Sequence, residues 1–333
     1  MKRYVFAGMT LVFCVVCLQL VGAAIPAATT SLFVQDWGGA TLYVGGTGPG
    51  NYTRIQQALD DASDGDTVFV YRGVYTETIS IQKAVCLTGE DKNGTVIEGP
   101  GSGTVVEIAA DGAAVHHFAI TGGGGDAFDD AGVYIASDSV VLQDTIIRDN
   151  QGHGVFLFSA SYCILVHNVL VDNRYGGIYL TNESHFNNIS YNTVQSSISG
   201  VNVERSHYQT IMYNRVIQCS NGIYLTESRE NLVQGNHLSD NEEGLFCFYA
   251  VRNTIQFNNF VSNARHARFM KFLHVGFIAP NMWRHNYWDD WLQVGVKAIY
   301  GGVYVRTFTL IGIFIPWVEV DWCPAREPYE WIT

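Results

Sequence analysis

The sequence predicts an all-β fold, a parallel β-helix in which each coil of the chain forms one rung of a solenoid. A motif of glycine, aliphatic residue, any residue and aliphatic residue occurs six times, with steps of 22, 23, 23, 22 and 22 residues between the glycines. A polar column repeats at nearly the same spacing, and none of the seven prolines lies between Pro100 and Pro280. A period of this length, made of strand-forming segments, indicates a solenoid. The lack of proline is expected where nearly every amide donates to a neighbouring strand.

Residues 1–24 are predicted to be a signal peptide or an N-terminal membrane anchor. Lys2 and Arg3 precede an apolar run from Tyr4 to about Val21, and small residues follow. This order is typical of a secretory signal, although the run is nearly long enough to span a bilayer. We therefore expect a secreted or cell-surface protein.

Residues 40–280 are predicted to form the β-helix, with a short helix near 53–63 covering its first coil. The apolar face of this helix consists of Ile55, Ala58, Leu59 and Ala62. Asn51 or Thr53 is the expected N-cap. A cover is needed because an exposed strand edge invites aggregation.

The repeated motif defines strands that line the core. Its six copies begin at Gly132, Gly154, Gly177, Gly200, Gly222 and Gly244. Side chains alternate between the two faces of a strand, so the aliphatic residues of each copy point inward and the residue between them points outward. The polar column consists of Asp144, Asn168, Asn192, Asn214, Asn236 and Asn258. We expect it at a corner, where an amide tolerates left-handed backbone and bonds to its copies in adjacent coils.

Residues 281–333 are predicted to form a C-terminal cap. Six of the seven tryptophans lie there, namely Trp283, Trp288, Trp291, Trp317, Trp322 and Trp331. The apolar stretch from Phe308 to Val318 contains Pro316 and is too short to span a bilayer. A packed cap is the simpler interpretation, and a surface that docks a protein partner is the alternative.

Charge and cysteine content restrict the function. The chain has 19 basic and 31 acidic residues, a net charge of −12, and no lysine between Lys92 and Lys271. We expect no nucleic-acid partner, because proteins that bind nucleic acid carry basic surfaces. Beyond the N-terminal run, the five remaining cysteines are an odd number, and Cys247 occupies an inward position of a repeat. Buried thiols are therefore expected rather than a disulfide framework.

Three segments resemble the NosD-like right-handed parallel β-helix family. They are TRIQQALDDASDGDTVFVYRGVYTETISI (53–81), NGIYLTESRENLVQGNHL (221–238) and NYWDDW (286–291). The resemblance covers roughly residues 40–295. It implies a right-handed solenoid built from the repeat of carbohydrate-binding and sugar-hydrolysis domains, of a type abundant among archaeal secreted and surface proteins. Family members include polysaccharide lyases, hydrolases, epimerases and an accessory protein linked to copper-site maturation, so the resemblance is specific for the fold rather than for one activity.

The outward residues of the glycine motifs predict a polysaccharide-binding stripe. They are Tyr134, Phe156, Tyr179, Asn202, Tyr224 and Phe246. Five are aromatic and adjacent rungs are about 4.8 Å apart, so an extended glycan along the axis would stack its sugar rings on them. Packing of the aromatic rings against one another is the other interpretation.

Asp130, His153, Tyr175 and Arg174 are the candidate catalytic residues. They directly precede glycine motifs in three adjacent coils, which predicts an acid–base cluster at one edge of the stripe. The glycine-rich insertion 122–130 is expected to cover this edge as a lid. Such a cluster would suit a polysaccharide lyase, a glycoside hydrolase or an epimerase. The other interpretation is that these are solvated turn residues.

No cofactor is evident from the sequence. The ten histidines fall in different columns, and no Cys-x-x-Cys lies beyond the N-terminal run. A calcium ion would have oxygen ligands from Asp126, Asp129, Asp130 and backbone carbonyls, although no complete calcium-binding loop is present.

Three functions remain open at this point. The first is binding, and in the enzymatic case processing, of extracellular polysaccharide along the aromatic stripe. The second is a non-catalytic structural or adhesion role at the cell surface, with the tryptophan-rich end docking a neighbour. The third is an accessory role in copper-centre assembly, which only the family resemblance suggests.

Overall fold

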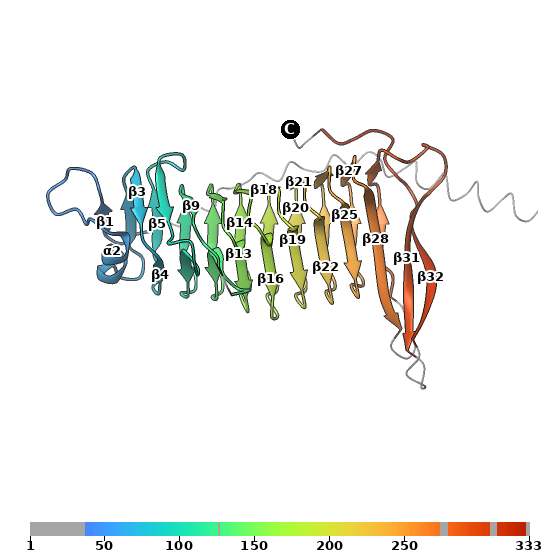
Figure 1. Ribbon diagram of the computed structural model, residues 1–333, viewed down its shortest axis with the longest axis horizontal. Coiled ribbons are helices and arrows are strands. Elements are labelled where there is room, and N and C mark those ends of the chain that lie inside the picture. Colours follow the sequence, from blue (N-terminus) through green and yellow to red (C-terminus); the bar gives the residue numbers. More distant parts are fainter. Residues whose placement is uncertain (1–36, 126, 274–278, 307–311, 331–333) are drawn as a thin grey trace, which may run out of the picture. The chain divides into compact units, whose positions relative to one another are not determined.

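The computed structural model describes residues 37–125, 127–273, 279–306 and 312–330. Within these residues one helix, α2 (Ile55–Asp61), lies between the first strand, β1 (Thr41–Val44), and a long series of parallel strands (Figure 1). This confirms the predicted fold class, a right-handed parallel β-helix. The predicted signal peptide or anchor, residues 1–24, lies outside the described part. None of the helices in that part is long and apolar enough to cross a membrane.

Three parallel sheets enclose the core. The first sheet contains β4 (Ile79–Ile81), β7 (Val106–Ile108), β10 (Ala131–Ile135), β13 (His153–Phe158), β16 (Gly176–Thr181), β19 (Ser199–Glu204), β22 (Asn221–Thr226), β25 (Glu243–Phe248), β28 (Arg265–Leu273) and β31 (Lys297–Arg306). The second sheet contains β1 (Thr41–Val44), β2 (Thr67–Val70), β5 (Cys86–Gly89), β8 (Ala114–His116), β11 (Val141–Gln143), β14 (Ile164–Val166), β17 (Asn188–Ser190), β20 (Thr210–Met212), β23 (Leu232–Gln234), β26 (Thr254–Gln256) and β29 (Met282–Arg284). The third sheet contains β3 (Gly73–Thr76), β6 (Thr95–Glu98), β9 (Ala119–Thr121), β12 (Ile146–Arg148), β15 (Val169–Val171), β18 (Thr193–Gln195), β21 (Arg215–Ile217), β24 (His237–Ser239), β27 (Asn259–Val261) and β30 (Tyr287–Trp288). The last strand, β32 (Gly312–Asp321), pairs antiparallel with β31.

The glycine motifs lie in the first sheet and are in register from coil to coil. In β13 the side chains of Val155 and Leu157 are fully buried in the core, whereas Phe156 lies outside the core. Each motif begins with glycine because the chains approach closely there: a Cβ on Gly154 would lie 2.7 Å from the carbonyl oxygen of Gly177. The inward rows and outward column predicted from the alternation are therefore present.

Side-chain amides form a ladder at each of the three corners. The 2–3 ladder, between the second and third sheets, consists of Asn168, Asn192, Asn214, Asn236, Asn258 and Asn286. The 1–2 ladder consists of Asn187, Gln209, Asn231, Asn253 and Asn281. The 3–1 ladder has Asn150 and Asn173 on one side of a gap and Asn241 and Asn263 on the other. In the 2–3 ladder, for example, Asn214 accepts the backbone N–H of Asn192 at 2.9 Å and donates to the carbonyl of Ile189 at 2.8 Å.

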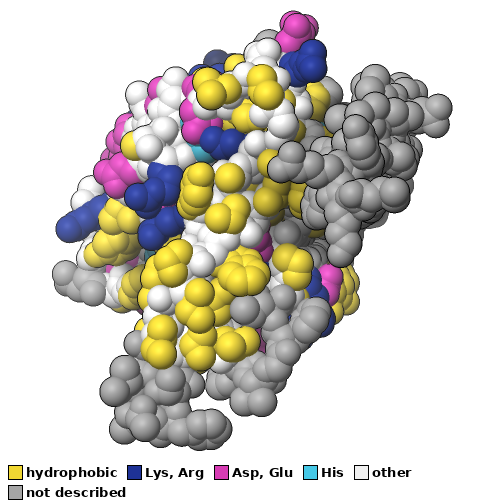
Figure 2. Space-filling model, turned by 90° about the vertical axis from the view of Figure 1, so that its right-hand side faces the viewer, with side chains coloured by type: hydrophobic (Ala, Val, Ile, Leu, Met, Phe, Trp, Pro, Cys, Tyr) yellow, Lys and Arg dark blue, Asp and Glu magenta, His cyan; other side chains and the backbone are white. Residues whose placement is uncertain are grey.

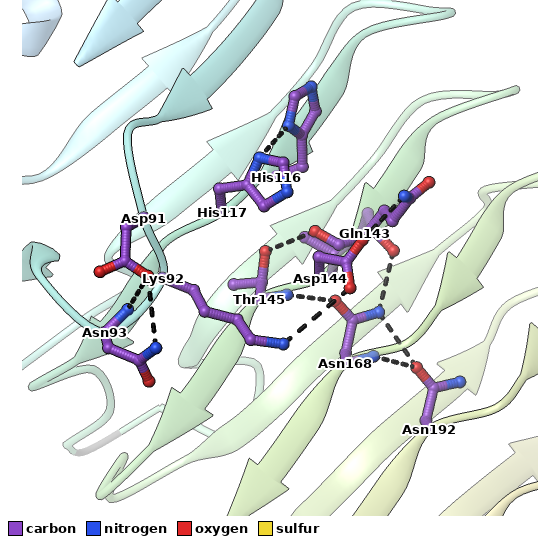
Figure 3. A network of polar contacts seen from close by, with 11 residues as sticks. Asp91, Lys92, Asn93, His116, His117, Gln143, Asp144, Thr145, Asn168 and Asn192 are labelled. Atoms are coloured by element: carbon purple, nitrogen blue, oxygen red, sulfur yellow. Dashed lines mark hydrogen bonds and ion pairs between the residues drawn. The ribbon is translucent and has the colours of Figure 1, made fainter. Parts of the chain in front are cut away.

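Two details of the predicted polar column are wrong. Asp144 is one residue out of register, because Thr145 occupies the position opposite Asn168 and donates its backbone N–H to that amide (Figure 3). The left-handed residue is not the asparagine but the one before it, as at His167 with φ of 57°. The reason is geometric: the amide must point into the corner to bond two neighbouring coils, so the preceding residue makes the turn and points outward.

The helix α2 covers the N-terminal end as predicted, but its cap differs from the prediction. Neither Asn51 nor Thr53 caps it. The Glu77 carboxylate accepts the backbone N–H groups of Ile55 at 2.8 Å and Gln56 at 3.2 Å. A carboxylate from the next segment suits this place, because it satisfies two unpaired donors and the positive end of the helix together.

The C-terminal end closes the ladders with buried carboxylates. Glu319 of β32 accepts the backbone N–H of Asn281 at 2.9 Å, and Asp321 accepts that of Asn286 at 3.0 Å. Trp288 stacks on Phe260 with ring centroids 4.2 Å apart and covers the last of the core. The buried ammonium of Lys271 pairs with Glu319, so that carboxylate is not left as an isolated charge.

We expect Asn214→Ala to lower the free energy of unfolding by about 2–4 kcal/mol, because it deletes a buried amide and leaves the donors of Asn192 unpaired. The exposed amide of Gln151 provides a control, and Gln151→Ala is expected to change that free energy by about 0.5 kcal/mol or less. Urea unfolding followed by circular dichroism measures both. Equal losses in the two variants would contradict the structural role assigned to the ladder.

Candidate functional site

The predicted stripe residues stack on one another outside the core. The ring centroids of Tyr134 and Phe156 are 5.6 Å apart and those of Phe156 and Tyr179 are 5.2 Å apart, with interplanar angles of 8° and 18°. Beyond Asn202, the rings of Tyr224 and Phe246 stack at 5.1 Å. A sugar needs about 7 Å to enter between two faces, twice the contact distance of carbon atoms. A glycan laid along this column would therefore meet mainly ring edges.

Much of the stripe is also covered. Phe156, Tyr179 and Phe246 are less than a tenth exposed, whereas Tyr134 and Tyr224 are partly exposed. Phe128, from the insertion 122–130, packs edge-on against Phe156 and Tyr179. The guanidinium of Arg268 lies 3.7 Å from the centre of the Phe246 ring. The insertion thus lies over the stripe edge, and the substrate-binding role of the five rings stays a prediction.

His153 is enclosed in this aromatic cluster. Its side chain is 2% exposed, and its ring contacts those of Phe128, Tyr175 and Tyr179. Neither ring nitrogen forms a hydrogen bond of ordinary geometry, although the backbone of Phe128 lies close enough to favour the protonated form slightly. Burial dominates and lowers the pKa of His153 to about 4. In this conformation a bound sugar has no path to the imidazole.

The other three candidate catalytic residues lie around His153 without forming a hydrogen-bonded set with it. The Asp130 carboxylate accepts the backbone N–H of Ala127 at 3.2 Å, and the Asp130 carbonyl accepts that of His153. The guanidinium of Arg174 lies 5.5 Å from the ring centre of its neighbour Tyr175. The acid–base role of these residues also stays a prediction.

Glu204 is a further polar group beside this cluster. The Tyr179 hydroxyl donates to the Glu204 carboxylate, and burial together with this bond raises the pKa of Tyr179. Arg205 forms an ion pair with the same carboxylate at 3.0 Å. Glu204 is thus held by two partners within the described chain.

An open, shallow depression of about 530 Å³ lies at the corner between the third and first sheets, next to Arg174. Its lining consists of Arg174, Ser196, Ser197, Ile198, Gln218, Cys219, Ser220, Asp240 and Glu242. The Arg174 guanidinium and the carboxylates of Asp240 and Glu242 form no ion pair with other described residues. The sequence interpretation included Arg174 but missed the depression, because small residues at a turn give no signal by themselves.

Sequence reasoning also missed the exposed aromatic columns at the turns. Tyr162, Phe186 and Tyr208 stack with centroid distances of 5.2 and 4.9 Å, and all three are exposed. All three adopt left-handed backbone with φ between 56° and 60°. Each of them directly precedes a residue at the 1–2 corner, such as Asn187, and this recurring pair is the signal that would have revealed the column.

Two groups of side chains in the described chain have the residue types of metal ligands. His266 lies 2.7 Å from Asp289 and 3.4 Å from Asp290. The Lys297 ammonium, however, lies 2.6 Å from both oxygens of Asp290, so a cation is already present there. This group is explained as a network of ion pairs.

The second group is Cys86, His116 and His117 (Figure 3 shows the two histidines). The Cys86 sulfur lies 3.1 Å from Nε2 of His116, whereas His117 Nδ1 lies 3.0 Å from Nδ1 of the same ring. One ion cannot contact all three residues, because two of them lie at opposite ends of one imidazole. Burial also raises the pKa of Cys86 to about 11, which disfavours the thiolate that metals bind.

The predicted calcium ligands do not form a group of three in the described chain. Asp126 lies outside the described residues. Asp129 is exposed, and Asp130 is engaged with the Ala127 backbone. Calcium binding stays a prediction.

Stability is expected to fall as the pH decreases from about 6.5 to about 4, because unfolded His153 binds a proton in that range and folded His153 does not. The contribution of this residue is about 2–3 kcal/mol. His153→Phe keeps an aromatic ring in the cluster and should reduce the loss of stability between pH 7 and pH 4.5. His116, whose pKa is also about 4, retains its share in both proteins. Urea unfolding at the two pH values tests this, and equal losses in the two proteins would contradict it.

Residues 59–292 match the family described as periplasmic copper-binding protein (NosD). No curated protein gives a match to the chain.

Several solved structures share the fold. Alginate lyase from Paenibacillus sp. str. FPU-7 is 13% identical with a TM-score of 0.52, covering 74% of this chain and 95% of that one. The A-module of mannuronan C-5 epimerase AlgE4 from Azotobacter vinelandii is 15% identical with a TM-score of 0.52, covering 69% and 81%. Lacto-N-biosidase from Eubacterium ramulus is 14% identical with a TM-score of 0.57, covering 75% and 63%. At these identities the likeness shows a common fold and nothing finer. The family match spans more than half of the sequence, and the chain therefore belongs to the NosD family.

Proposed function

We propose that this protein is an extracytoplasmic glycan-binding protein and that its glycan lies in the depression between Arg174 and Glu242. The observation that carries this proposal is an open polar surface with three charged groups that have no ion-pair partner in the described chain. Charged side chains at solenoid turns usually pair or lie singly in water. Here they surround one depression.

The lining has the chemistry that sugars need. Ser196, Ser197 and Ser220 supply hydroxyls and Gln218 supplies an amide, all of which match sugar hydroxyls. Ile198 is about half exposed and offers an apolar surface to the C–H face of a sugar ring. The solved structures with this fold include proteins named for polysaccharide substrates, which supports the same class of ligand for this chain.

Binding is proposed here ahead of catalysis. Among the candidate acid–base residues, His153 is enclosed under Phe128 and is out of reach of a sugar in this conformation. The Cys219 thiol in the depression is buried, which raises its pKa to about 11 and keeps it neutral. The lyase, hydrolase or epimerase alternative requires the insertion 122–130 to move.

Copper binding, which the family description names, does not fit the side chains in the described part of the protein. Cys86 and His117 contact different nitrogens of the His116 ring, so one ion cannot contact all three residues. Lys297 pairs with Asp290, one of the two carboxylates near His266, and so a cation already occupies that group. We therefore assign no copper chemistry to these residues.

We expect Asp240→Asn combined with Glu242→Gln to weaken glycan binding by about tenfold or more, because each change removes a charged acceptor for sugar hydroxyls. A glycan array identifies ligands and isothermal titration calorimetry measures the affinity. Glu183→Gln, an exposed carboxylate at another corner, serves as the matched control. Unchanged affinity in the double variant, or the lack of any glycan ligand, would contradict the proposal.

A second candidate function, a structural or adhesion role, is favoured by the C-terminal end. Both faces of β32 expose large apolar side chains, namely Ile313, Phe314, Ile315, Trp317 and Val318. Figure 2 shows hydrophobic side chains gathered over this end of the solenoid. Apart from its pairing with β31, β32 pairs with described residues only at Asp321, opposite Trp283, so no other described strand pairs with its outer edge over the apolar segment. Antiparallel pairing with the same edge of a second copy would give a symmetric dimer.

If this end joins two copies, Ile315→Ser combined with Trp317→Ser should shift the protein from dimer to monomer, because it removes buried apolar area from the contact. Sedimentation velocity over a range of concentrations measures the shift. Val74→Ser changes an exposed apolar residue on β3, near the other end, and should leave the association unchanged. A wild-type protein that stays monomeric at all concentrations would count against this second function.

A further inference from the structure

The depression lies at a gap in the 3–1 ladder. Strand register aligns Ser197 and Cys219 with Asn173 before them and Asn241 after them. Asn150 donates to Asn173, and Asn241 donates to Asn263, on the two sides of the gap. At the two ladder positions of the gap the side chains are a hydroxyl and a thiol instead of an amide. These two coils thus lack the amide that occupies this corner in the coils before and after them.

The backbone conformation just before the ladder position is the same in these two coils as in their neighbours. The residue before each ladder position is left-handed throughout, with φ of 55° at Asp172, 56° at Ser196, 55° at Gln218 and 56° at Asp240. The corner would therefore hold asparagine without strain. The coil after the gap has the same three-residue connection and holds Asn241, so the gap results from the side chains and not from the path of the chain.

The floor of the gap holds a buried polar atom without a partner. Ser197 is 6% exposed, and its hydroxyl forms no hydrogen bond with any described residue. A buried hydroxyl in this state costs free energy unless a ligand or water completes its bonds. The amide of asparagine at this position would have avoided that cost. At Ser197 the fold therefore lacks a hydrogen bond that an asparagine would form.

Arg174 lies over one end of the gap because its coil is longer. Between the third and first sheets, the chain has four residues after Val171 and before Gly176, but three after Gln195 and before Ser199. The extra residue displaces Arg174 outward at the rim of the depression. A guanidinium without a carboxylate partner is suited to bidentate bonding with a planar anion.

We propose that the ladder gap is a built binding site for an acidic oligosaccharide, with a sugar carboxylate on Arg174 and a sugar hydroxyl on Ser197. This inference rests on the proposed glycan-binding function and specifies its ligand. The lining runs from the coil of Arg174 to the coil of Glu242, which is three rungs of about 4.8 Å each, so the site suits several sugar units rather than one. Asp240 and Glu242 at the far end accept hydroxyls and repel a second acidic group.

The test compares the wild type with three variants of the full chain. Ser197→Asn combined with Cys219→Asn refills the ladder, and we expect it to raise the melting temperature by a few degrees while binding is lost. Ser197→Ala removes only the unpartnered hydroxyl and should weaken binding about fivefold to tenfold, at an equal or higher melting temperature because a buried unsatisfied group is lost. Arg174→Gln should remove the preference for the acidic ligand. The probes are oligosaccharides with a single uronate unit at one end and the same oligosaccharides after reduction of that carboxyl group.

The possible outcomes distinguish failure of this inference from failure of the proposed glycan-binding function. Binding of the acidic probe at least tenfold tighter than the reduced probe in the wild type, lost in Arg174→Gln and in the refilled variant, supports the inference. Equal binding of both probes would contradict the proposal of an acidic ligand, although glycan binding itself would still be supported. A refilled variant that is more stable and still binds overturns the location. If the refilled variant fails to fold, Ser197→Ala decides the location, and unchanged binding there overturns it. If no glycan binds the wild type, the proposed function itself fails.

Discussion

The corners of the solenoid turn the backbone so that its N–H and C=O groups point inward, away from water. A side-chain amide satisfies both, because it accepts from one coil and donates to another. The aliphatic core is the larger source of stability, but it is non-directional and would tolerate slippage between coils. The amide ladders fix the register, since each Asn bonds to backbone groups in particular neighbours. The positions of all outward groups, including Arg174 and Glu242, depend on that register.

A ladder must end, and the last donor at each end needs a different acceptor. At the C-terminal end Glu319 and Asp321, two residues apart on β32, point to the same side and receive the final amides of two ladders. Trp283 and Trp288 donate their indole N–H groups to the same carboxylates. The NYWDDW segment therefore helps to close the ladders through Asn286 and Trp288. At the N-terminal end Glu77 performs a similar role for α2.

Much of the architecture is predictable from the sequence because it repeats. Glycine spacing and alternation identified the first sheet, and the asparagine column identified one corner. The register error at Asp144 arose because asparagine and aspartate look alike as a pattern, whereas only the amide both donates and accepts. The gap at Ser197 and Cys219 escaped notice because the missing amides are visible only once coils are aligned in space. The covering of His153 by Phe128 depends on how a long insertion folds, which no local pattern encodes.

The length of the candidate site depends on how many consecutive coils lack an amide at the 3–1 corner. Each coil adds one residue to the 3–1 column and one rung of about 4.8 Å to the length of the depression. Duplication of a 22-residue unit such as 200–221, which carries Cys219, would lengthen the site by one rung without changing either end. Exchange of a single ladder residue between asparagine and a smaller one would open or close the surface one coil at a time. A scaffold of this kind can evolve the size of its ligand in discrete steps while its core stays the same.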